Sequence, residues 1–427
     1  MTNKEIIKLL IAEYQQKAVE VTFMRRPYKM EDKLNYVLVG LRRVGKSYLM
    51  FQQIRHLLDT GHSNQEILYF NFEDDRIASL STEDLDLIKV CYEEMFDNKP
   101  IFFLDEIQIV NHWEKFARRL ADQGYRVYIT GSNAKMLSSE IATTLGGRYI
   151  IQDVYPYSFQ EFLGSMNIDI TDRNLIYRFR TGIEKAFENY FRFGGLPELT
   201  QVSDKRAWLS SLYQKIFFGD LVTRYQIRND FALRVLIRKL AESVKQPTSF
   251  NRLANIVSSA GKKVSTDTVI DYLGYLVESW LLFPVENICA RLADKESNKK
   301  YYFSDNGILN LFLTDPSASL LENLTAIQLR RLYNDEVYYY HHSIEVDFYV
   351  PKEQLAVQVC YSLQDPETRK RELNAILKMI RRMEVKRTII ITKDEEETIS
   401  ETGINIDVIP CWKWLSLEDN PFSGKEG

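Results

Sequence analysis

The residues with the clearest capacity for chemistry form one loop, Gly-Leu-Arg-Arg-Val-Gly-Lys-Ser at positions 40–47. This spacing after an apolar run is typical of a loop whose successive backbone N–H groups wrap a phosphate. Gly40 and Gly45 permit backbone conformations that a side chain would block. We predict that Lys46 reaches the β- and γ-phosphates of a nucleotide and that Ser47 holds Mg²⁺. A glycine-rich turn that matches by chance is the alternative.

A second stretch, residues 100–106, runs from four consecutive apolar residues into Asp105 and Glu106. The carboxyl end of a parallel strand is the edge at which α/β sheets bind ligands, so we predict that Asp105 holds the same Mg²⁺. Glu106 is then the candidate general base that activates the attacking water. The predicted nucleotide-binding residues are Gly40, Leu41, Arg42, Arg43, Val44, Gly45, Lys46, Ser47 and Asp105.

Two further positions could complete a catalytic set. Ser132 and Asn133 follow the strand expected at 126–130, and we predict that Asn133 helps to position the water, with a plain turn as the alternative. Arg148 precedes the strand expected at 149–154, and it could stabilise γ-phosphate charge in its own subunit or in a neighbour. The predicted catalytic residues are therefore Glu106, Asn133 and Arg148.

The elements that must position these residues are visible in the apolar patterns. Near-continuous apolar runs at 67–72, 101–104 and 126–130 are typical of strands buried on both faces of a parallel sheet. Residues 3–20 and 48–58 carry apolar side chains at helical spacing, which predicts two flanking helices. We therefore expect a parallel α/β sheet of the P-loop NTPase type in the N-terminal part.

Composition narrows the class of protein. The net charge of −4 gives no general attraction to nucleic acid, so such binding would need a local basic face. The N-terminus is charged where a signal peptide would be apolar, and no run approaches about 18 apolar residues, so we expect a cytoplasmic protein without a membrane span. The four cysteines are far apart, which argues against a disulfide framework or a zinc site.

Taken together, the motifs resemble the prokaryotic AAA-type ATPases that carry a C-terminal domain of unknown function. The resemblance rests on the loop at 40–47, Leu-Asp-Glu-Ile-Gln at 104–108, Thr-Gly-Ser-Asn at 130–133, Gly-Gly-Arg at 146–148 and Tyr-Pro-Tyr-Ser-Phe-Gln-Glu-Phe at 155–162. It implies an AAA-type ATPase core in residues 1–165, a helical lid in 166–230, a winged-helix segment in 231–305 and a restriction-endonuclease-like α/β domain in 306–427. ATP and Mg²⁺ are the implied ligands.

The segments after the core offer fewer chemical signals. The lid contains a Gly-Gly-x-Pro-Glu turn at 194–198, and Arg224 could sense nucleotide or form a salt bridge. A turn at 260–263 between two predicted helices suggests a helix-turn-helix, which could contact DNA or a protein. The basic face of this segment would comprise Arg234, Arg238, Lys239, Lys262, Lys263, Lys299 and Lys300.

The C-terminal part contains an incomplete nuclease pattern. Asp347 stands on a predicted strand, and Glu322 on the preceding helix could join it. Gln358 and Cys360 occupy the positions where a metal-dependent nuclease needs an acid and a lysine. An amide and a thiol cannot supply that ligand charge, so we predict a nuclease-like fold without cleavage activity.

The sequence predicts an ATP-binding and ATP-hydrolysing AAA-type protein whose nucleotide state controls its C-terminal domains, with double-stranded DNA or a protein as target. The alternative is a nucleotide-gated DNA- or protein-binding module with little or no turnover. A homo-oligomer is left open, because an arginine that acts between subunits looks the same in sequence as one that acts within its own.

Overall fold

The computed structural model describes residues 3–78, 80–132, 143–168, 177–401 and 403–417. These residues divide into two compact units: one holds residues 1–155 with 278–280, and the other holds 156–277 with 281–427. We call them unit 1 and unit 2. No helix among the described residues is long and apolar enough to cross a bilayer.

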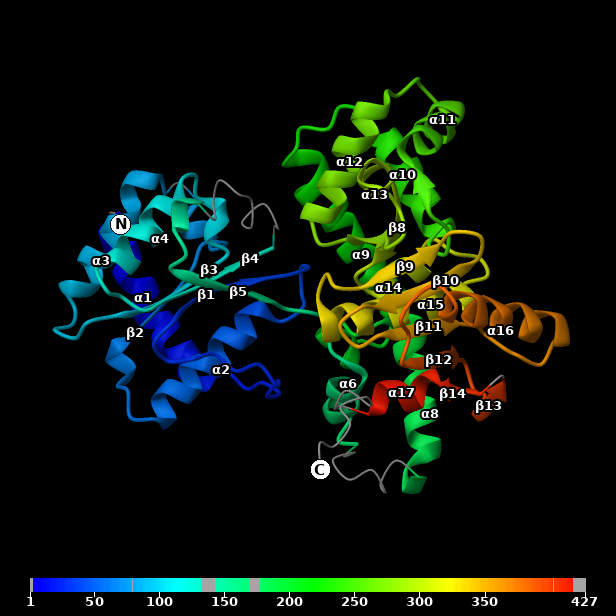
Figure 1. Cartoon of the computed structure of the whole chain (residues 1–427). Coiled ribbons are helices and arrows are strands. Elements are labelled where there is room, and N and C mark those ends of the chain that lie inside the picture. The colour runs from blue at the N-terminus through cyan, green and yellow to red at the C-terminus, as the bar shows by residue number, and fades with distance from the viewer. Residues whose placement is uncertain (1–2, 79, 133–142, 169–176, 402, 418–427) are drawn as a thin grey trace. The chain divides into compact units, whose positions relative to one another are not determined.

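Unit 1 is built on a five-stranded sheet in the order β2-β3-β4-β1-β5, with all neighbouring strands parallel. Its strands are β1 (Asn35–Val39), β2 (Ile67–Asn71), β3 (Ile101–Asp105), β4 (Val127–Gly131) and β5 (Tyr149–Asp153). Its helices are α1 (Asn3–Glu20), α2 (Lys46–Asp59), α3 (Leu85–Glu93) and α4 (Trp113–Asp122), and they lie on both sides of the sheet (Figure 1). The parallel α/β sheet predicted from the apolar runs is confirmed.

The order of the strands places the chemical residues at one edge. β1 lies between β4 and β5, and β3 lies between β2 and β4, so the ends of β1, β3 and β4 are close together. Each strand consists almost entirely of buried residues, except β5, where Ile150 and Ile151 are exposed at the sheet edge. The phosphate loop and the two carboxylates therefore follow neighbouring strand ends.

Unit 2 begins with helices and continues into a nine-stranded mixed sheet, in the order β13-β14-β12-β11-β10-β9-β7-β8-β6. The first helices are α6 (Phe159–Ser165), α8 (Arg180–Phe193), α9 (Lys205–Lys215), a π-helix (Ile216–Thr223), α10 (Asp230–Glu242), α11 (Phe250–Ala260) and α12 (Thr266–Glu278). The later helices are α13 (Leu292–Ser297), α14 (Asn306–Asn310), α15 (Ser317–Tyr333), α16 (Pro366–Ile380) and α17 (Cys411–Ser416).

The sheet of unit 2 joins the two segments that the resemblance separates. Its strands are β6 (Thr248–Ser249), β7 (Leu282–Asn287), β8 (Asn298–Phe303), β9 (Tyr338–His341), β10 (Glu345–Val350), β11 (Leu355–Val359), β12 (Arg387–Thr392), β13 (Glu397–Glu401) and β14 (Ile404–Pro410). β7 pairs with β9 in parallel and so connects the winged-helix strands to the nuclease-like strands. Helix α6, expected within the ATPase core, packs in unit 2 against α8 and α17. The four-part division stays a prediction.

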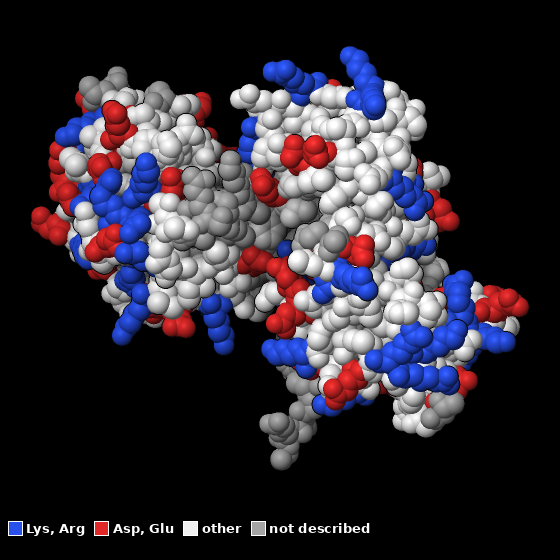
Figure 2. All heavy atoms as spheres, turned by 45° about the horizontal axis from the view of Figure 1, so that its top comes forward, with Lys and Arg blue, Asp and Glu red and all other residues white. Residues whose placement is uncertain are grey.

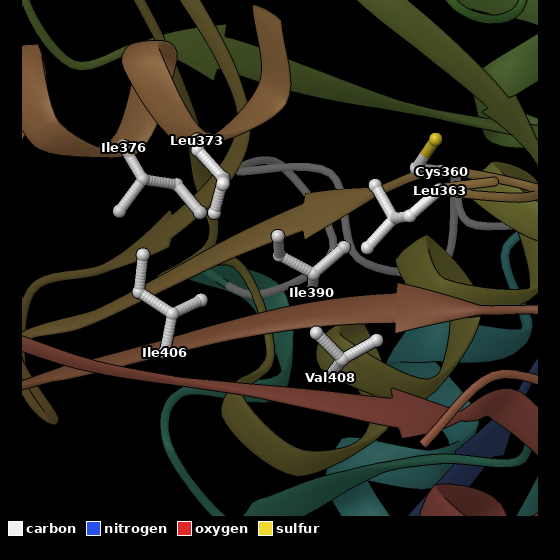
Figure 3. Close-up of a cluster of buried hydrophobic side chains, with 7 residues drawn as sticks. All are labelled: Cys360, Leu363, Leu373, Ile376, Ile390, Ile406 and Val408. Carbon is white, nitrogen blue, oxygen red and sulfur yellow. The ribbon is translucent and has the colours of Figure 1, made fainter. Parts of the chain in front are cut away.

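An apolar core fills the space between α16 and this sheet (Figure 3). Leu373 and Ile376 of α16 contact Ile390, Ile406 and Val408 of the strands below, all in one buried cluster. The same cluster contains Cys360, which follows β11 directly. The apolar face of α16 is therefore buried against the sheet, and only its opposite face contacts solvent.

Candidate active site

The phosphate loop is held by backbone geometry that only glycine supplies at two points. Gly40 has φ 152°, and a Cβ there would collide with the carbonyl oxygen of Val154 on the neighbouring segment. Gly45 has φ 93° and caps the N-terminus of α2. The loop thus passes from β1 into a helix N-terminus, whose backbone N–H groups and dipole favour an anion. Leu41 and Val44 are buried, and Arg43 is exposed with φ 64°.

Lys46 lies folded against its own loop. Its side chain is 4% exposed, and Nζ donates to the carbonyl oxygens of Gly40 and Leu41, each at 3.1 Å. The carboxylate of Glu106 lies 3.8 Å from the same ammonium. Backbone carbonyls are weak partners for a cation compared with phosphate oxygens, so a nucleotide at the loop would supply a stronger interaction than the present ones.

Asp105 is the last residue of β3, and its buried carboxylate accepts hydrogen bonds from two hydroxyl groups. Tyr69 on β2 donates to Oδ2 at 2.5 Å, and Thr130 on β4 donates to Oδ1. Burial and the nearby charge of Glu106 raise the pKa of Asp105, while hydrogen bonds from Thr130, Tyr69 and Ser47 oppose that rise. A cation at this carboxylate would favour its ionised form further.

Glu106 follows Asp105 in a left-handed conformation, with φ 54°. Its backbone N–H donates to the Thr130 hydroxyl at 2.8 Å, and Gln108 donates to its carboxylate. Burial would raise the pKa of Glu106, but the ammonium of Lys46 and the Gln108 amide outweigh it, so the pKa is lowered. The carboxylate is therefore ionised near neutral pH, which is the state that a general base needs.

The predicted Mg²⁺ ligands are adjacent and of the right type. The Ser47 hydroxyl at the start of α2 hydrogen-bonds to the Asp105 carboxylate. A hydroxyl and a carboxylate are oxygen donors, which a hard divalent cation prefers. These two residues therefore fit Mg²⁺ bound beside a phosphate at the loop.

A buried arginine fixes the loop from the side. Arg26 is 6% exposed, and its guanidinium donates to the carbonyl of Val44 at 2.8 Å and to that of Tyr155 at 2.9 Å. On the other side of the loop, Arg42 forms an ion pair with Glu73 at 2.9 Å. Arg26 therefore links the phosphate loop to the last residue of unit 1.

The remaining catalytic candidates are placed differently. Asn133 lies outside the described residues, whereas Ser132 is buried, with its Oγ 3.5 Å from the Gln108 amide nitrogen. The backbone carbonyl of Arg148 accepts from Asn35 at the start of β1, whereas the loop follows the end of β1. Four residue steps along a strand span about 13 Å. The structure therefore does not bring Arg148 to the phosphate loop of its own chain.

Arg148 and Arg224 both have acidic partners. Arg148 pairs with Asp122 on α4. Arg224, considered above as a nucleotide sensor or a salt-bridge residue, pairs with Asp220 at 3.2 Å in unit 2. The salt-bridge alternative for Arg224 is therefore observed.

A second lysine-centred cluster lies in unit 2. Lys300 on β8 is fully buried, and its Nζ lies 3.2 Å from Glu322, 2.7 Å from Glu345 and 3.4 Å from Asp347. Tyr302 donates to Glu322 at 2.8 Å. Placing Lys300 on an exposed basic face was wrong, because these carboxylates hold its ammonium inside the sheet. Its neighbour Lys299 pairs with Glu286.

The nuclease-like positions have structural partners. Gln358 accepts from the backbone N–H of Asp347 at 3.2 Å and donates to Glu372 at 2.6 Å. Cys360 lies in the apolar cluster of Figure 3, where burial raises its pKa to about 11. Among the described residues, no group of three or more His, Cys, Asp or Glu side chains is arranged to hold a metal ion.

Sequence reasoning gave no role to several residues of these two clusters. The sequence predicts a buried strand around Tyr69 and places Gln108 in the Leu-Asp-Glu-Ile-Gln motif, but it assigns neither side chain a role. A polar group inside a buried strand next to a strand-end carboxylate is a signal that could have identified Tyr69, since buried hydroxyls need partners. Lys300 had no such signal, because its three carboxylates lie 22 to 47 residues further along the chain.

Comparison with protein families gives two matches. Residues 32–163 match the model of an AAA domain, and residues 184–319 match a domain of unknown function. The first match contains the phosphate loop, Asp105, Glu106 and Arg148. The second begins within α8 and ends at the start of α15, and it includes α9 to α12 and the strands β6 to β8.

Two curated proteins resemble most of the chain. The uncharacterized protein MJ1544 of Methanocaldococcus jannaschii is 32% identical over 393 residues, which cover 88% of this chain and 87% of that protein. An uncharacterized protein of Haemophilus influenzae is 31% identical over 341 residues, covering 77% and 83%. Similarity of this extent includes both units.

Solved structures give weaker similarity. The Walker-type ATPase PABY2304 of Pyrococcus abyssi has a TM-score of 0.36 and 13% identity, covering 73% of this chain and 96% of that one. The ORC1 protein of Aeropyrum pernix, solved in complex with DNA, has a TM-score of 0.30 and 14% identity, covering 74% and 93%. Scores this low do not decide a function.

Proposed function

Because this chain belongs to the same family as MJ1544 of M. jannaschii and contains an AAA domain, we propose that it binds and hydrolyses ATP with Mg²⁺. The observation that carries this proposal is the convergence of Lys46, Asp105 and Glu106 on one sheet edge beside a glycine-defined helix N-terminus. These are the charges that phosphoryl transfer to water requires.

Each residue has a distinct task in this proposal. Lys46 exchanges its loop carbonyls for the β- and γ-phosphate oxygens and neutralises their charge. Ser47 and Asp105 hold Mg²⁺, which when bound offsets the phosphate charge. Glu106, kept ionised by Lys46 and oriented by Gln108 and the Thr130 hydroxyl, accepts a proton from the attacking water.

Arg148 is proposed to act between subunits. Its position at the opposite end of the sheet from the loop leaves a neighbouring copy as the nucleotide site that it could reach. Mixing Lys46→Ala with Arg148→Ala protein tests this directly. We expect two inactive preparations to regain turnover when mixed, since some interfaces then combine an intact loop with an intact arginine. No recovery would argue against an intersubunit role.

Nucleotide state is proposed to reach unit 2 through the end of unit 1. Arg26 bonds both to the phosphate loop, at Val44, and to Tyr155, directly before unit 2 begins. Pro156 and Tyr157 are in turn bound within unit 2, by Arg331 at 2.7 Å and by Gly195 at 2.7 Å. The residues before the junction are thus bound within unit 1 and those after it within unit 2, which supports this stretch of chain as the route.

Unit 2 is proposed to contain a winged helix and a nuclease-like domain without cleavage activity. The order α10, β6, α11, α12, β7, β8, with β8 between β6 and β7, supports the first assignment. The absence of cleavage is supported by the ammonium of Lys300, which lies among the carboxylates where a metal cation would be needed. Either DNA or a protein fits unit 2 as its target.

ATP turnover by the full chain tests the proposed function. Wild type, Lys46→Ala and Glu106→Gln are compared with and without double-stranded DNA. We expect Lys46→Ala to lose binding and turnover, and Glu106→Gln to bind ATP but hydrolyse it at least about 100-fold more slowly. Glu83→Gln, the same change at an exposed carboxylate of unit 1, is the matched control.

The rival function makes the opposite prediction. A nucleotide-gated binding module would bind ATP yet turn it over no faster than Glu106→Gln, with or without DNA. The presence of Glu106 beside the phosphate loop, 3.8 Å from the Lys46 ammonium, favours hydrolysis over this rival.

A further inference from the structure

The solvent-exposed face of α16 contains a row of basic side chains that the proposed ATP hydrolysis does not involve. Five of them are exposed, and we call this set the basic stripe: Lys370, Arg371, Lys378, Arg381 and Arg382. At 3.6 residues per turn they fall within an arc of about 120° and extend over about 18 Å along the helix and the turn after it. Between Lys370 and Arg382 the other exposed residue on this face is Asn374, and the exposed Glu367 lies on the same face one turn before Lys370.

The net charge around the basic stripe is positive, whereas the net charge of the whole chain is negative. Residues 368–383 contain six basic residues and one acidic residue, a net charge of +5, whereas the whole chain has −4. The single acid, Glu372, is buried and is bound by Gln358 and Arg371. Figure 2 shows a dense group of Lys and Arg side chains toward its right side, the side on which Figure 1 shows α16.

Ion pairs with carboxylates of the same chain do not neutralise most of this positive charge. Among the residues that the structure describes, Lys370, Lys378 and Arg381 form no ion pair with a carboxylate. Arg382 contacts the ring nitrogen Nδ1 of His342 at 2.9 Å. Lys378 and Arg381 lie at the C-terminus of α16, where the helix dipole favours cations by about 0.3–1 kcal/mol. Lys370 and Arg371 lie in the N-terminal half of the helix, where the dipole gives no such stabilisation, so helix stability does not account for the whole stripe.

The other face of α16 excludes a membrane as the partner. Leu373, Ile376 and Met379 are buried against the sheet, so the helix has no apolar face left to insert into a bilayer. The stripe also contains no exposed aromatic side chain on which the bases of a single strand could stack. A rigid, purely cationic row matches a partner with regularly repeated negative charge.

We propose that the basic stripe of α16 binds the sugar-phosphate backbone of double-stranded DNA without sequence preference. A B-form duplex carries one negative charge per about 1.7 Å of axis, so about 18 Å of helix faces several phosphates at once. This inference rests on the proposed function only in taking DNA as one of its two candidate targets, and the row of positive charge on α16 favours DNA over a protein. It places the main contact on α16 rather than on the turn of the winged-helix segment.

The test measures binding of the full chain to a labelled duplex of about 30 base pairs, without nucleotide, from about 50 to about 200 mM KCl. The test variant is Lys370→Gln, Lys378→Gln and Arg381→Gln combined. The matched control removes three exposed lysines near the winged helix: Lys245→Gln, Lys262→Gln and Lys263→Gln. Circular dichroism checks that both variants are folded, and ATP turnover is measured separately.

We expect the stripe variant to bind at least about tenfold more weakly at about 100 mM salt, with the slope of log K against log salt reduced by about 2.7. The control should keep more than half of the affinity. Equal losses in both variants, or a loss in the control alone, would overturn the proposal. So would the absence of duplex binding by wild type, or tighter binding to double-stranded RNA, to an acidic protein or to anionic vesicles. Failure of ATP turnover would instead contradict the proposed function, because this binding needs no nucleotide.

Discussion

Units 1 and 2 each contain a buried lysine beside carboxylates, Lys46 and Lys300, and these two lysines differ in what surrounds them. Lys46 in unit 1 donates to two backbone carbonyls of its own loop, and the carboxylate of Glu106 lies 3.8 Å from its ammonium. Lys300 in unit 2 is enclosed by Glu322, Glu345 and Asp347, with distances of 2.7 to 3.4 Å. One ammonium is held by exchangeable backbone carbonyls, and the other by three carboxyl groups.

This difference separates a binding site from a structural cluster. A carbonyl gives way to a phosphate at little cost, since the carbonyl can find water. A buried carboxylate that loses its cation is left uncompensated in a medium of low dielectric, which is expensive. Lys46 is therefore available to a ligand, whereas Lys300 is committed to the fold. The following predictions test this contrast.

The largest effect is expected from Lys300→Met. Three carboxylates would share a buried site without a cation, and we expect the free energy of unfolding of unit 2 to fall by about 3–5 kcal/mol. Urea denaturation followed by the fluorescence of Trp412 and Trp414 measures this, because both indoles are buried in unit 2. Lys299→Met, at a lysine that pairs with the part-exposed Glu286, should cost about 1 kcal/mol or less. Unfolding of both variants at the same urea concentration would show that Lys300 is not structural.

Lys46→Ala should give the reverse pattern. We expect ATP turnover to fall by about 10²–10³, as for loss of one preorganised group that stabilises developing charge. The free energy of unfolding should change by less than about 1 kcal/mol, because the loop carbonyls regain water. A loss of several kcal/mol, seen in the same urea experiment, would place Lys46 with Lys300 as a structural lysine.

Asp305→Asn tests a buried carboxylate that has no lysine. Asp305 accepts from the backbone of Gly195 at 2.9 Å and of Gly307 at 2.8 Å, and a Cβ at Gly194 would collide with it. The amide replaces one acceptor by a donor that faces N–H groups, so we expect a loss of about 1–3 kcal/mol in unfolding free energy.

The same residue gives a pH signature. Burial raises the pKa of Asp305 to about 6 from 3.8, despite hydrogen bonds from Gly195, Gly307 and Ile308. A raised pKa in the folded state means that stability is fully present below pH 3.8 and is lost as the pH rises to about 6. Asp305→Asn should lack this fall, which urea titrations at several pH values detect. An unchanged pH profile would mean that another group titrates.

The smallest effect is expected from Tyr69→Phe, which removes one donor from Asp105 and leaves the packing intact. Since hydrogen bonds to the ionised form lower a pKa, we expect the pKa of Asp105 to rise further. The acid limb of ATP turnover should then move to higher pH, because Mg²⁺ binding needs the carboxylate. Thr130→Val, which removes the other hydroxyl donor, should move it in the same direction. A shift to lower pH in either variant would contradict this role.

Much of unit 1 could be predicted from sequence because its signals are local. The loop at 40–47, the apolar runs of β2, β3 and β4, and the strand-end pair Asp105 and Glu106 each occupy a few consecutive residues. Buried parallel strands need such runs, and a phosphate loop needs glycine at fixed offsets. Helix α1 was predicted with the same bounds, Asn3–Glu20, from its apolar spacing.

The contacts between segments distant in the chain could not be predicted from the sequence. Tyr69 and Thr130 meet at Asp105 only because β2 and β4 flank β3, and Lys300 meets its carboxylates only because β8, α15 and β10 pack together. Arg148 stood near the motifs in the chain, yet strand direction puts it at the far end of β1. The sequence by itself determined the local backbone that binds a phosphate. Only the tertiary structure decided which carboxyl groups surround each buried lysine, because Glu106 reaches Lys46, and Glu322 and Asp347 reach Lys300, from residues remote in the chain.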